Sequence, residues 1–465
     1  MQTPQSLQIP AIGLTLLRAL RLSMVLVAVL GSAAVLLGCS EKAKDVRTSL
    51  KDSNVVFIVV DTLRADHLPL YGYPKDTAPF VTSLRSHSVI FDRAISACSS
   101  TGPAMASVFT SLYPSQHGLI TGILATQRLV KSNPENPTIK ISRIPVPLKT
   151  LGQYFKEAGY RTFGVADNLN ISEQQGFTKG FDKFATYRYE GAPTVNRTLR
   201  EWSSEIKAAG RYFLYVHYMD PHAPYHRRKP WFVKGASRAE STLNAYDSEI
   251  RYADEHIREL FEMFNLDRNT LVVFLSDHGE EFGDHGGSGH GKTLYREVIH
   301  VPLFFYHPSF TETRVTEVVH TIDVLPTLAS VLGLATDAHW VGKSLEGFIP
   351  GSAQQRFAAD SRPVFSQLLR RPEHEKDPKE SVIHERHHLI VTPKRDGRIV
   401  EELYQLDEDF VEQVDLAAAR RDIVQGLAGK FRELHEKKPG IQAEEVDLPL
   451  DADAIRSLKT LGYLE

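Results

Sequence analysis

From about residue 54 onward the chain alternates continuous apolar runs with amphipathic stretches. Continuous runs that end in polar residues are typical of strands buried on both faces of a parallel sheet. Stretches with helical periodicity, such as PLKTLGQYFKEAG and LNAYDSEIRYADEHIRELFEMF, lie between them. We therefore predict an α/β fold with a doubly wound, mainly parallel sheet flanked by helices. The apolar runs are found in NVVFIVVDTLRAD, YRTFGVADN, RYFLYVHYMDPHAPY and NTLVVFLSDHGEEFGDHG.

The pattern changes after about Gly333. RHHLIVTPKRDGRIVEELYQL predicts an antiparallel hairpin turned at residues 395–397. The stretch RRPEHEKDPKESVIHER is very polar and indicates a surface loop, and the tail DADAIRSLKTLGYLE indicates a short helix. We predict a catalytic domain over residues 54–339 and a smaller α+β region over residues 340–465.

The N-terminal segment is of another kind. Two arginines precede an apolar run over about residues 22–37, which is typical of an export signal over residues 1–38. The run ends in Leu-Leu-Gly before Cys39 and resembles the lipobox of bacterial lipoproteins, so Cys39 is the expected lipidation site and 39–53 a polar tether. An uncleaved membrane anchor is the alternative. Either way we expect the remaining chain to lie outside the cytoplasm, and we predict a bacterial membrane-anchored lipoprotein that faces the periplasm or the cell exterior.

Composition excludes some partners. The net charge of -3 gives no basis for a nucleic-acid partner. With 42% hydrophobic and 24% charged residues the chain is globular. Only Cys98 remains after Cys39, so the mature body forms no intramolecular disulfide, and the sequence has no zinc-type cysteine cluster.

Polar residues that follow the predicted strands are the candidates for chemistry. Asp61 follows the first apolar run, and Asp277 and His278 follow a later one. The carboxyl ends of parallel strands meet at one edge of the sheet, where ligands bind. Two carboxylates and an imidazole that converge there would make a divalent metal site. A strand-end aspartate can also be a helix N-cap, and this alternative stays open for Asp61 alone.

Two further stretches carry clustered polar groups. In HYMDPHAPY, His222 is a candidate substrate contact, whereas His217 is also compatible with simple packing. In SDHGEEFGDHGGSGHGK, the glycines allow close backbone approach to a ligand; a loop without a role is the alternative. That stretch holds Asp277, His278, Glu280, Asp284, His285, His290 and Lys292.

Taken together, these pieces resemble the sulfatase family of the alkaline phosphatase superfamily, in the family's order from about Asn54 to Leu416. Several such segments together are far more specific than any one of them. The matching segments are VVFIVVDTLRADHLPLYGY, ACSSTGPAMASVFTSLYPSQHGL, FLYVHYMDPHAPY, LSDHGEEFGDHG, GHGKTLYREVIHVPL, HTIDVLPTLASVLG and EELYQLDEDFVEQVDLA.

The resemblance implies one catalytic divalent metal ion. Asp61 matches the first of the family's paired aspartates, and Thr62 stands where the second would be. Asp277 and His278 match the second metal cluster. The family usually uses calcium, but one carboxylate fewer and a histidine ligand leave manganese or zinc open.

The resemblance also implies residues that bind the ester. His222 and Lys292 match residues that grip sulfate or phosphate oxygens. The family's lysine and histidine after the next strand have no clear counterpart, and Asn168 stands in that region. Asn168 and His290 complete the predicted substrate contacts.

The nucleophile departs from the family pattern. Typical sulfatases carry Cys-x-Pro-Ser-Arg-Ala, whose cysteine is oxidised to formylglycine. Cys98 lies in the wrong frame, whereas Thr101 places Pro103 and Ala106 in register, with Met105 in place of the arginine. Threonine cannot become formylglycine, but a metal-activated hydroxyl can attack an ester directly. Cys98 is then a small buried residue.

We therefore expect a metal-dependent hydrolase or transferase of anionic sulfate or phosphate esters, with Thr101 as direct nucleophile and phosphoesters favoured. The substrate is a glycan, a lipid or a small molecule. Two alternatives remain: a formylglycine-independent sulfuric ester hydrolase, and a catalytically inactive protein that binds anionic ligands.

Overall fold

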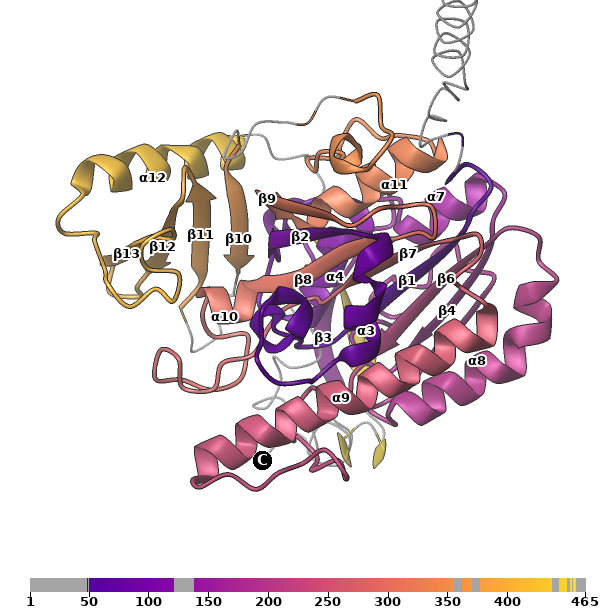
Figure 1. Cartoon of the computed structure of the whole chain (residues 1–465). Coiled ribbons are helices and arrows are strands. Elements are labelled where there is room, and N and C mark those ends of the chain that lie inside the picture. Colours follow the sequence, from indigo (N-terminus) through magenta and orange to yellow (C-terminus); the bar gives the residue numbers. More distant parts are fainter. Residues whose placement is uncertain are drawn as a thin grey trace, which may run out of the picture. The chain divides into compact units, whose positions relative to one another are not determined.

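The predicted apolar runs form strands of one eight-stranded sheet in the computed structural model (Figure 1). The strand order is β5-β4-β6-β1-β7-β8-β2-β9, and β8 alone runs against its neighbours. The predicted α/β class with a mainly parallel sheet is confirmed. The strands are β1 (Asn54–Val60), β2 (Ser88–Ile95), β4 (Arg161–Ala166), β5 (Lys183–Thr186), β6 (Tyr212–Tyr218), β7 (Thr270–Leu275), β8 (His300–Tyr306) and β9 (Thr313–His320).

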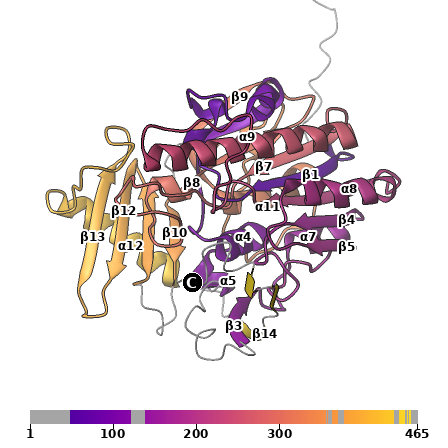
Figure 2. The ribbon, with the colours of Figure 1, turned by 90° about the horizontal axis from the view of Figure 1, so that it is seen from below.

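Helices cover both faces of this sheet, which explains why the central strands are apolar at every position. Successive residues of a strand point to opposite faces, and those of β1 enter two separate cores. Figure 2 shows α9 on one side of the strands and α4 and α7 on the other. One face carries α8 (Ala192–Lys207) and α9 (Arg238–Phe264); the other carries α4 (Thr101–Thr110), α7 (Leu151–Glu157) and α11 (Val324–Leu332).

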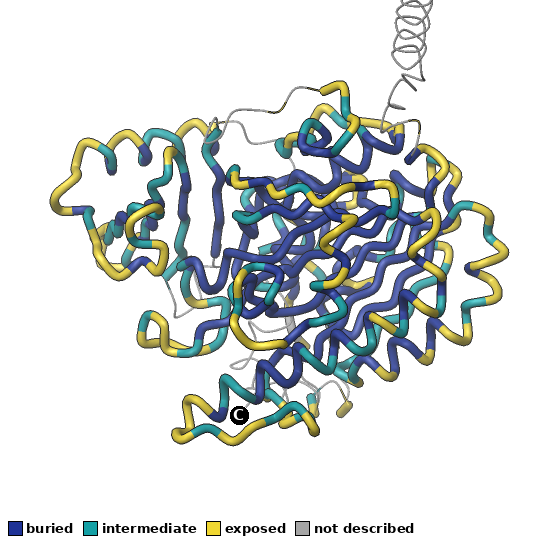
Figure 3. Tube along the Cα trace, in the orientation of Figure 1, coloured by how far each residue is buried: buried dark blue, intermediate teal, exposed yellow. Residues whose placement is uncertain are grey.

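The burial pattern follows this layering (Figure 3). The central strands β1, β6, β7 and β8 are buried along nearly their whole length, whereas α9 alternates buried and exposed positions. Helix α9 begins after Ser237, whose side chain accepts a hydrogen bond from the Glu240 amide, and ends at Asn265 in the left-handed region. Shorter helices are α3 (Pro79–Ser83), α5 (Pro114–His117) and α10 (Arg296–Ile299).

A second sheet follows the main one in the chain. Its four strands are antiparallel in the order β10-β11-β12-β13, and the predicted hairpin turn contains Gly397 at φ 86°. The polar stretch predicted as a surface loop is a correction: its second half forms β11, which pairs on both sides. The elements are β10 (Val364–Leu368), β11 (Lys379–His384), β12 (His387–Pro393), β13 (Ile399–Gln405) and α12 (Arg421–Glu436); β3 (Thr138–Arg143) and β14 (Glu444–Pro449) pair separately.

The structure describes residues 48, 50–120, 138–354, 356, 362–369, 377–436, 443–449, 452, 453, 455 and 456. The predicted export signal, Cys39, most of the tether and most of the predicted tail helix lie outside these residues. Within the described part of the chain, no helix combines the length and the hydrophobicity needed to cross a membrane.

Strand direction positions the site. Because β1, β2, β4, β6 and β7 are parallel, the segments that follow them all emerge at the same edge of the sheet. Those segments carry Asp61, Thr101, Asn168, His222 and Asp277. The fold therefore gathers at one edge residues from five separate parts of the sequence.

Candidate active site

Two buried carboxylates form the floor of the site. Asp61 follows β1 and Asp277 follows β7, its neighbour in the sheet, and both are 0% exposed. Asp277 Oδ1 accepts hydrogen bonds from the amides of Thr62 at 3.3 Å and His278 at 2.9 Å. Asp61 Oδ1 and Asp277 Oδ2 have no hydrogen-bond partner in the structure. Buried carboxylate oxygens without a donor are costly unless a cation binds them.

The second oxygen of Asp61 is fixed by its neighbours. Asn168 Nδ2 donates to Oδ2 at 2.6 Å, and His217 Nε2 lies 3.1 Å away. The Tyr215 hydroxyl lies 2.9 Å from His217 Nδ1 and can donate to it, which leaves His217 Nε2–H for Asp61. Burial alone would raise the pKa of Asp61, but the His217 hydrogen bond and the nearby histidines hold that pKa well below its usual range. Asp61 is therefore held as a carboxylate.

The pKa of Asp277 shifts in the opposite direction to that of Asp61. Burial and the negative charge of Asp61 raise the pKa of Asp277 above its usual range. Two buried carboxylates at neighbouring strand ends repel each other, and a divalent cation between them would remove that repulsion.

Thr101 is the first residue of α4 and contacts both halves of this floor. Its side chain is 2% exposed, and Oγ1 lies 3.2 Å from His278 Nε2 and 3.5 Å from Asp61 Oδ2. His278 Nδ1 lies 2.9 Å from the Gly279 carbonyl oxygen and donates to it. In the neutral ring Nε2 is then an acceptor, so the Thr101 hydroxyl donates to it. Cys98, three residues earlier, is buried.

The residues at this edge fit a divalent metal ion. Asp61 Oδ1, Asp277 Oδ2, Thr101 Oγ1 and His278 Nε2 supply two carboxylates, a hydroxyl and an imidazole nitrogen. The two carboxylate oxygens have no hydrogen-bond partner, and His278 Nε2 lies 3.3 Å from Asp277 Oδ2 and 4.0 Å from Asp61 Oδ1. Ligand atoms of Asp61, Asp277 and His217 also lie within 4.8 Å of one another. Because His217 Nε2–H is directed at Asp61, His217 orients this carboxylate. Thr62 Oγ1 is a further buried oxygen without a partner.

Two more histidines stand over the site. The ring of His290 lies 4.5 Å from that of His278 and 5.0 Å from that of His222, measured between centroids. His222 Nδ1 lies 2.8 Å from the Ala223 carbonyl oxygen, and burial together with His290 lowers the pKa of His222 to about 4. His290 Nδ1 lies 3.1 Å from Oε1 of the buried Glu280. Burial opposes protonation of His290, but Glu280 and the site carboxylates raise its pKa.

Other predicted residues lie elsewhere. Lys292 is exposed, its Nζ donates to the Ser288 carbonyl oxygen, and within the described residues it has no hydrogen bond or ion pair with Thr101 or the carboxylates. Asp284 forms an ion pair with Arg64 at 2.9 Å. The structure thus brings Asp61, Thr101, Asn168, Asp277, His278, His222 and His290 together, and leaves Lys292 at the rim in this conformation.

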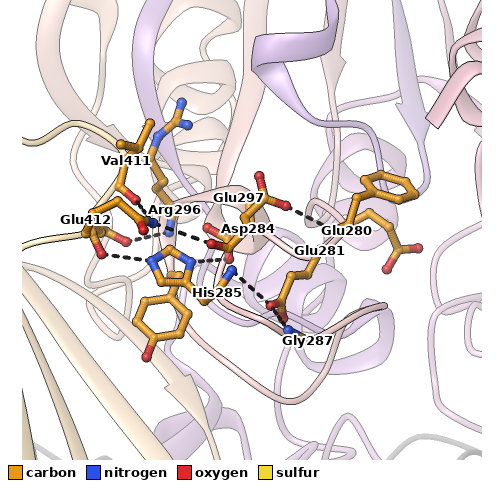
Figure 4. Close-up of polar contacts among 12 residues, drawn as sticks. Glu280, Glu281, Asp284, His285, Gly287, Arg296, Glu297, Val411 and Glu412 are labelled. Atoms are coloured by element: carbon orange, nitrogen blue, oxygen red, sulfur yellow. Dashed lines mark hydrogen bonds and ion pairs between the residues drawn. The ribbon is translucent and has the colours of Figure 1, made fainter. Parts of the chain in front are cut away.

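His285 secures the glycine-rich loop to the C-terminal region (Figure 4). His285 Nδ1 lies 2.8 Å from Glu297 Oε1, and Nε2 lies 2.8 Å from the Glu412 carbonyl oxygen. The Glu412 carboxylate accepts from the Arg296 amide at 2.8 Å and contacts His388 Nδ1. The amide of Glu280 donates to the Glu297 carbonyl oxygen at 3.1 Å. This network therefore reaches the segment that carries the metal-ligand candidates.

Sequence reasoning missed two residues that support the site. The sequence alone does not mark His217 as a site residue, because its contact with Asp61 depends on β6 lying beside β1. In the sequence Glu280 stands out only as part of a polar cluster. The one signal available was its place three residues after Asp277, on the segment that follows a strand.

The fold and site define a class of protein: an α/β enzyme whose strand ends gather buried carboxylates and histidines that could hold a divalent metal ion. The family model described as Sulfatase matches residues 53–334, more than half of the chain. The chain belongs to the sulfatase family, whose members in the alkaline phosphatase superfamily are hydrolases and transferases of sulfate or phosphate esters.

Individual relatives span both ester types. Phosphoethanolamine transferase EptC of Escherichia coli (strain O18:K1:H7, RS218) is 22% identical over 319 residues, which cover 61% of this chain and 52% of the transferase. The chain thus spans about half the length of that relative.

Solved structures share the fold. The phosphonate monoester hydrolase of Agrobacterium radiobacter superposes with a TM-score of 0.65 at 18% identity, covering 83% of this chain and 96% of that one. BT4656, solved in complex with its substrate D-glucosamine-2-N,6-O-disulfate, superposes with a TM-score of 0.67 at 16% identity. The match covers 83% of this chain and 98% of BT4656.

Proposed function

We propose that this chain is a threonine-dependent phosphoester hydrolase or phosphoryl transferase of the sulfatase family. One observation carries the proposal: the Thr101 hydroxyl lies 3.2 Å from His278 Nε2 and 3.5 Å from Asp61 Oδ2, beside two buried carboxylate oxygens without hydrogen-bond partners. The position that holds a modified cysteine in typical sulfatases is here an encoded hydroxyl.

The reaction proceeds in two displacements at phosphorus. Thr101 Oγ1 transfers its proton toward Asp61 Oδ2, the carboxylate oxygen that is not assigned to the cation, and attacks phosphorus, and the bond to the leaving oxygen breaks as the Oγ1–P bond forms. Water or an acceptor hydroxyl then attacks the phosphothreonine and regenerates Thr101. Neutral His222, whose Nδ1–H donates to the Ala223 carbonyl, can accept the proton of that second nucleophile at Nε2.

A divalent cation held by Asp61, Asp277, His278 and Thr101 would lower the pKa of the threonine hydroxyl and offset the charge on the transferred group. Asn168 and His217 keep the Asp61 carboxylate oriented, because the Asn168 side-chain amide and the His217 ring both donate hydrogen bonds to it. The mixed oxygen and nitrogen donor set favours zinc or manganese over calcium.

Phosphorus is favoured over sulfur for a chemical reason. A sulfated threonine lacks the hemiacetal-type exit that formylglycine provides, whereas a phosphothreonine is open to attack by water. The phosphoethanolamine transferase and the phosphonate monoester hydrolase support phosphoryl chemistry in this family and fold. The disulfated substrate of BT4656 supports an anionic ester as ligand. For location, we propose export and anchoring through Cys39.

The first prediction concerns Thr101. Thr101→Ala should reduce kcat by at least about a thousandfold on the best phosphoester, because no other hydroxyl replaces the nucleophile. Thr101→Ser keeps the hydroxyl and should retain measurable turnover. Acid quench during turnover of a ³²P-labelled phosphodiester, followed by peptide mapping, should place the label on Thr101.

Two outcomes would contradict this proposal. Turnover that persists in Thr101→Ala would remove the nucleophile. Release of sulfate from an aryl sulfate by the metal-loaded wild type, with no turnover of phosphoesters, would favour the sulfuric ester alternative.

A further inference from the structure

A polar cleft of about 530 Å³ lies beside the candidate active site. The segment that follows His222 and the first two turns of α9 form its walls. Figure 1 shows this N-terminal end of α9 extending beyond the sheet. Its lining includes Pro224, Tyr225, Arg227, Lys234, Arg238 and Thr242.

The charges of the cleft have one sign. Arg227, Lys234 and Arg238 are all exposed, none has an ion-pair partner among the described residues, and no carboxylate belongs to the lining. Nearby arginines on the same elements differ: Arg228 is paired with Glu249 at 2.6 Å and Arg251 with Asp254 at 3.0 Å. The cleft thus has three cations without a carboxylate partner among the described residues, one of which, Arg227, also lies over the Phe232 ring at 5.2 Å.

The acid closest in sequence does not neutralise them. Glu240 turns its carboxylate back to the loop, where Oε2 accepts from the Ala236 amide at 2.6 Å. The cleft therefore keeps an excess of positive charge.

The cleft borders segments of the chain that also carry or contact active-site residues. Helix α9 lines it from Arg238 to Ala245, a rise of about 10 Å at 1.5 Å per residue. The next residue, Tyr246, donates its hydroxyl to the Thr62 carbonyl oxygen at 2.7 Å. Tyr225 packs against Phe282 of the loop that carries Asp277 and His278, with ring centroids 5.3 Å apart. The segment that carries His222 therefore continues directly into a wall of the cleft, at Pro224 and Tyr225.

We propose that this cleft binds a second anionic group of the substrate, and that the substrate is a saccharide with a phosphate or sulfate beyond the ester that reacts. The proposal rests on the proposed function of the neighbouring site. Hydroxyl-bearing residues and backbone line the cleft between the cations and Tyr225, and the lining has no leucine, isoleucine or valine. That lining suits a hydrated, charged sugar rather than an acyl chain.

The test uses two charge-matched triple variants of the full chain. The cleft variant carries Arg227→Gln, Lys234→Gln and Arg238→Gln. The control variant carries Lys207→Gln, Arg268→Gln and Arg395→Gln, three exposed cations outside the cleft that have no ion pair in the described structure. Both change the net charge by the same amount, and melting temperatures check that both fold.

Binding is measured by fluorescence anisotropy at low salt with labelled tetrasaccharides. One is a sulfated heparin fragment, one a phosphorylated mannan fragment and one neutral maltotetraose. We expect the cleft variant to weaken binding of at least one anionic probe by about tenfold or more, and the control variant by less than about twofold. The probe that loses more affinity identifies the anion.

Activity on 4-nitrophenyl phosphate, which is too small to reach the cleft, should stay within about twofold of wild type in both variants. Equal loss of saccharide binding in both variants, or none in either, would overturn the proposal. So would binding to phosphatidylglycerol vesicles but to no tetrasaccharide. Absence of 4-nitrophenyl phosphate turnover in the wild type would count against the proposed function, while the binding result would still decide the cleft.

Discussion

Thr62 is the residue at which this chain differs most simply from the family pattern of paired aspartates. Its backbone lies in the left-handed region at φ 55°, which is uncommon for a β-branched residue, and Oγ1 is buried without a partner. The Thr62 amide donates to Asp277 and its carbonyl accepts from Tyr246. These two hydrogen bonds hold the Thr62 backbone and do not involve its side chain, so a substitution of the side chain leaves them in place.

Thr62→Asp should shift metal preference toward calcium. A third carboxylate adds a hard oxygen ligand and negative charge, and both raise calcium affinity, by about tenfold or more. Calorimetric titration of chelator-treated protein with calcium, manganese and zinc would measure this. Thr62→Asn matches the shape without the charge, and equal calcium affinities of the two variants would contradict the prediction.

Single residues also show how far the sequence predicts the site. Asp61, Asp277 and His278 stand directly after strand-forming runs, so their convergence follows from a parallel sheet. Thr101 follows from the frame set by Pro103 and Ala106. The contact between His217 and Asp61 could not be predicted, since it joins residues 156 positions apart through the order of strands. The exposed position of Lys292 depends on loop conformation, which no pattern of residue types specifies.

At the level of elements, His285 joins the glycine-rich loop to the segment at Glu412. Both ring nitrogens face acceptors, the Glu297 carboxylate and the Glu412 carbonyl, so the ring donates twice and carries a positive charge. Burial lowers the pKa of His285, but the hydrogen bonds with Glu412 and Glu297 and their charges raise it above the ordinary value. The Tyr295 ring stacks on the His285 ring with centroids 3.8 Å apart, and the Glu281 carboxylate accepts a hydrogen bond from the His285 amide.

His285→Gln should therefore lower the free energy of unfolding more at about pH 6 than at about pH 9. A raised folded-state pKa stabilises fully below the unfolded pKa, and that stabilisation is lost as pH rises through the folded value. The difference between the two pH values should be about 1 kcal/mol or more, the size of a charged hydrogen bond. Urea unfolding of wild type and variant gives it, and a pH-independent difference would show that the ring is neutral.

Elements also mark a limit of sequence reasoning. The hairpin of β12 and β13 is predictable because its turn contains Gly397 between two alternating runs. Strand β11 is not predictable, because it contains the polar residues Glu380 and Ser381. These pair on β10 with Gln367 and Ser366, two buried polar residues that the sequence does not identify as partners. The reversed direction of β8 is equally hidden, since a buried strand has the same composition in either direction.

At the scale of the whole molecule, buried neutral histidines set the response to acid. Burial lowers the pKa of His117 to about 3 and, as the leading cause, the pKa of His300, His307 and His320 to about 4. These histidines come from separate parts of the described chain. Because they gain protons only when the fold opens, acid favours unfolding through several regions at once.

Stability should thus fall as pH drops from about 6.5 toward 4. A depressed folded-state pKa gives a contribution that is present above the unfolded pKa and lost on acidification. Melting temperatures at about pH 7, 6 and 5 would show the decline. His300→Gln, which removes one titrating group, should flatten it, and a melting temperature that rises toward pH 5 would contradict the argument.

Helix α4 begins with a side chain that translation alone supplies in its final chemical form. Sulfatases that rely on formylglycine need a dedicated oxidising enzyme in the producing cell. A chain with threonine at this position has no such dependence, so cell-free synthesis or any expression host yields the same hydroxyl. The chemical form of this side chain is then independent of the organism that produces the protein.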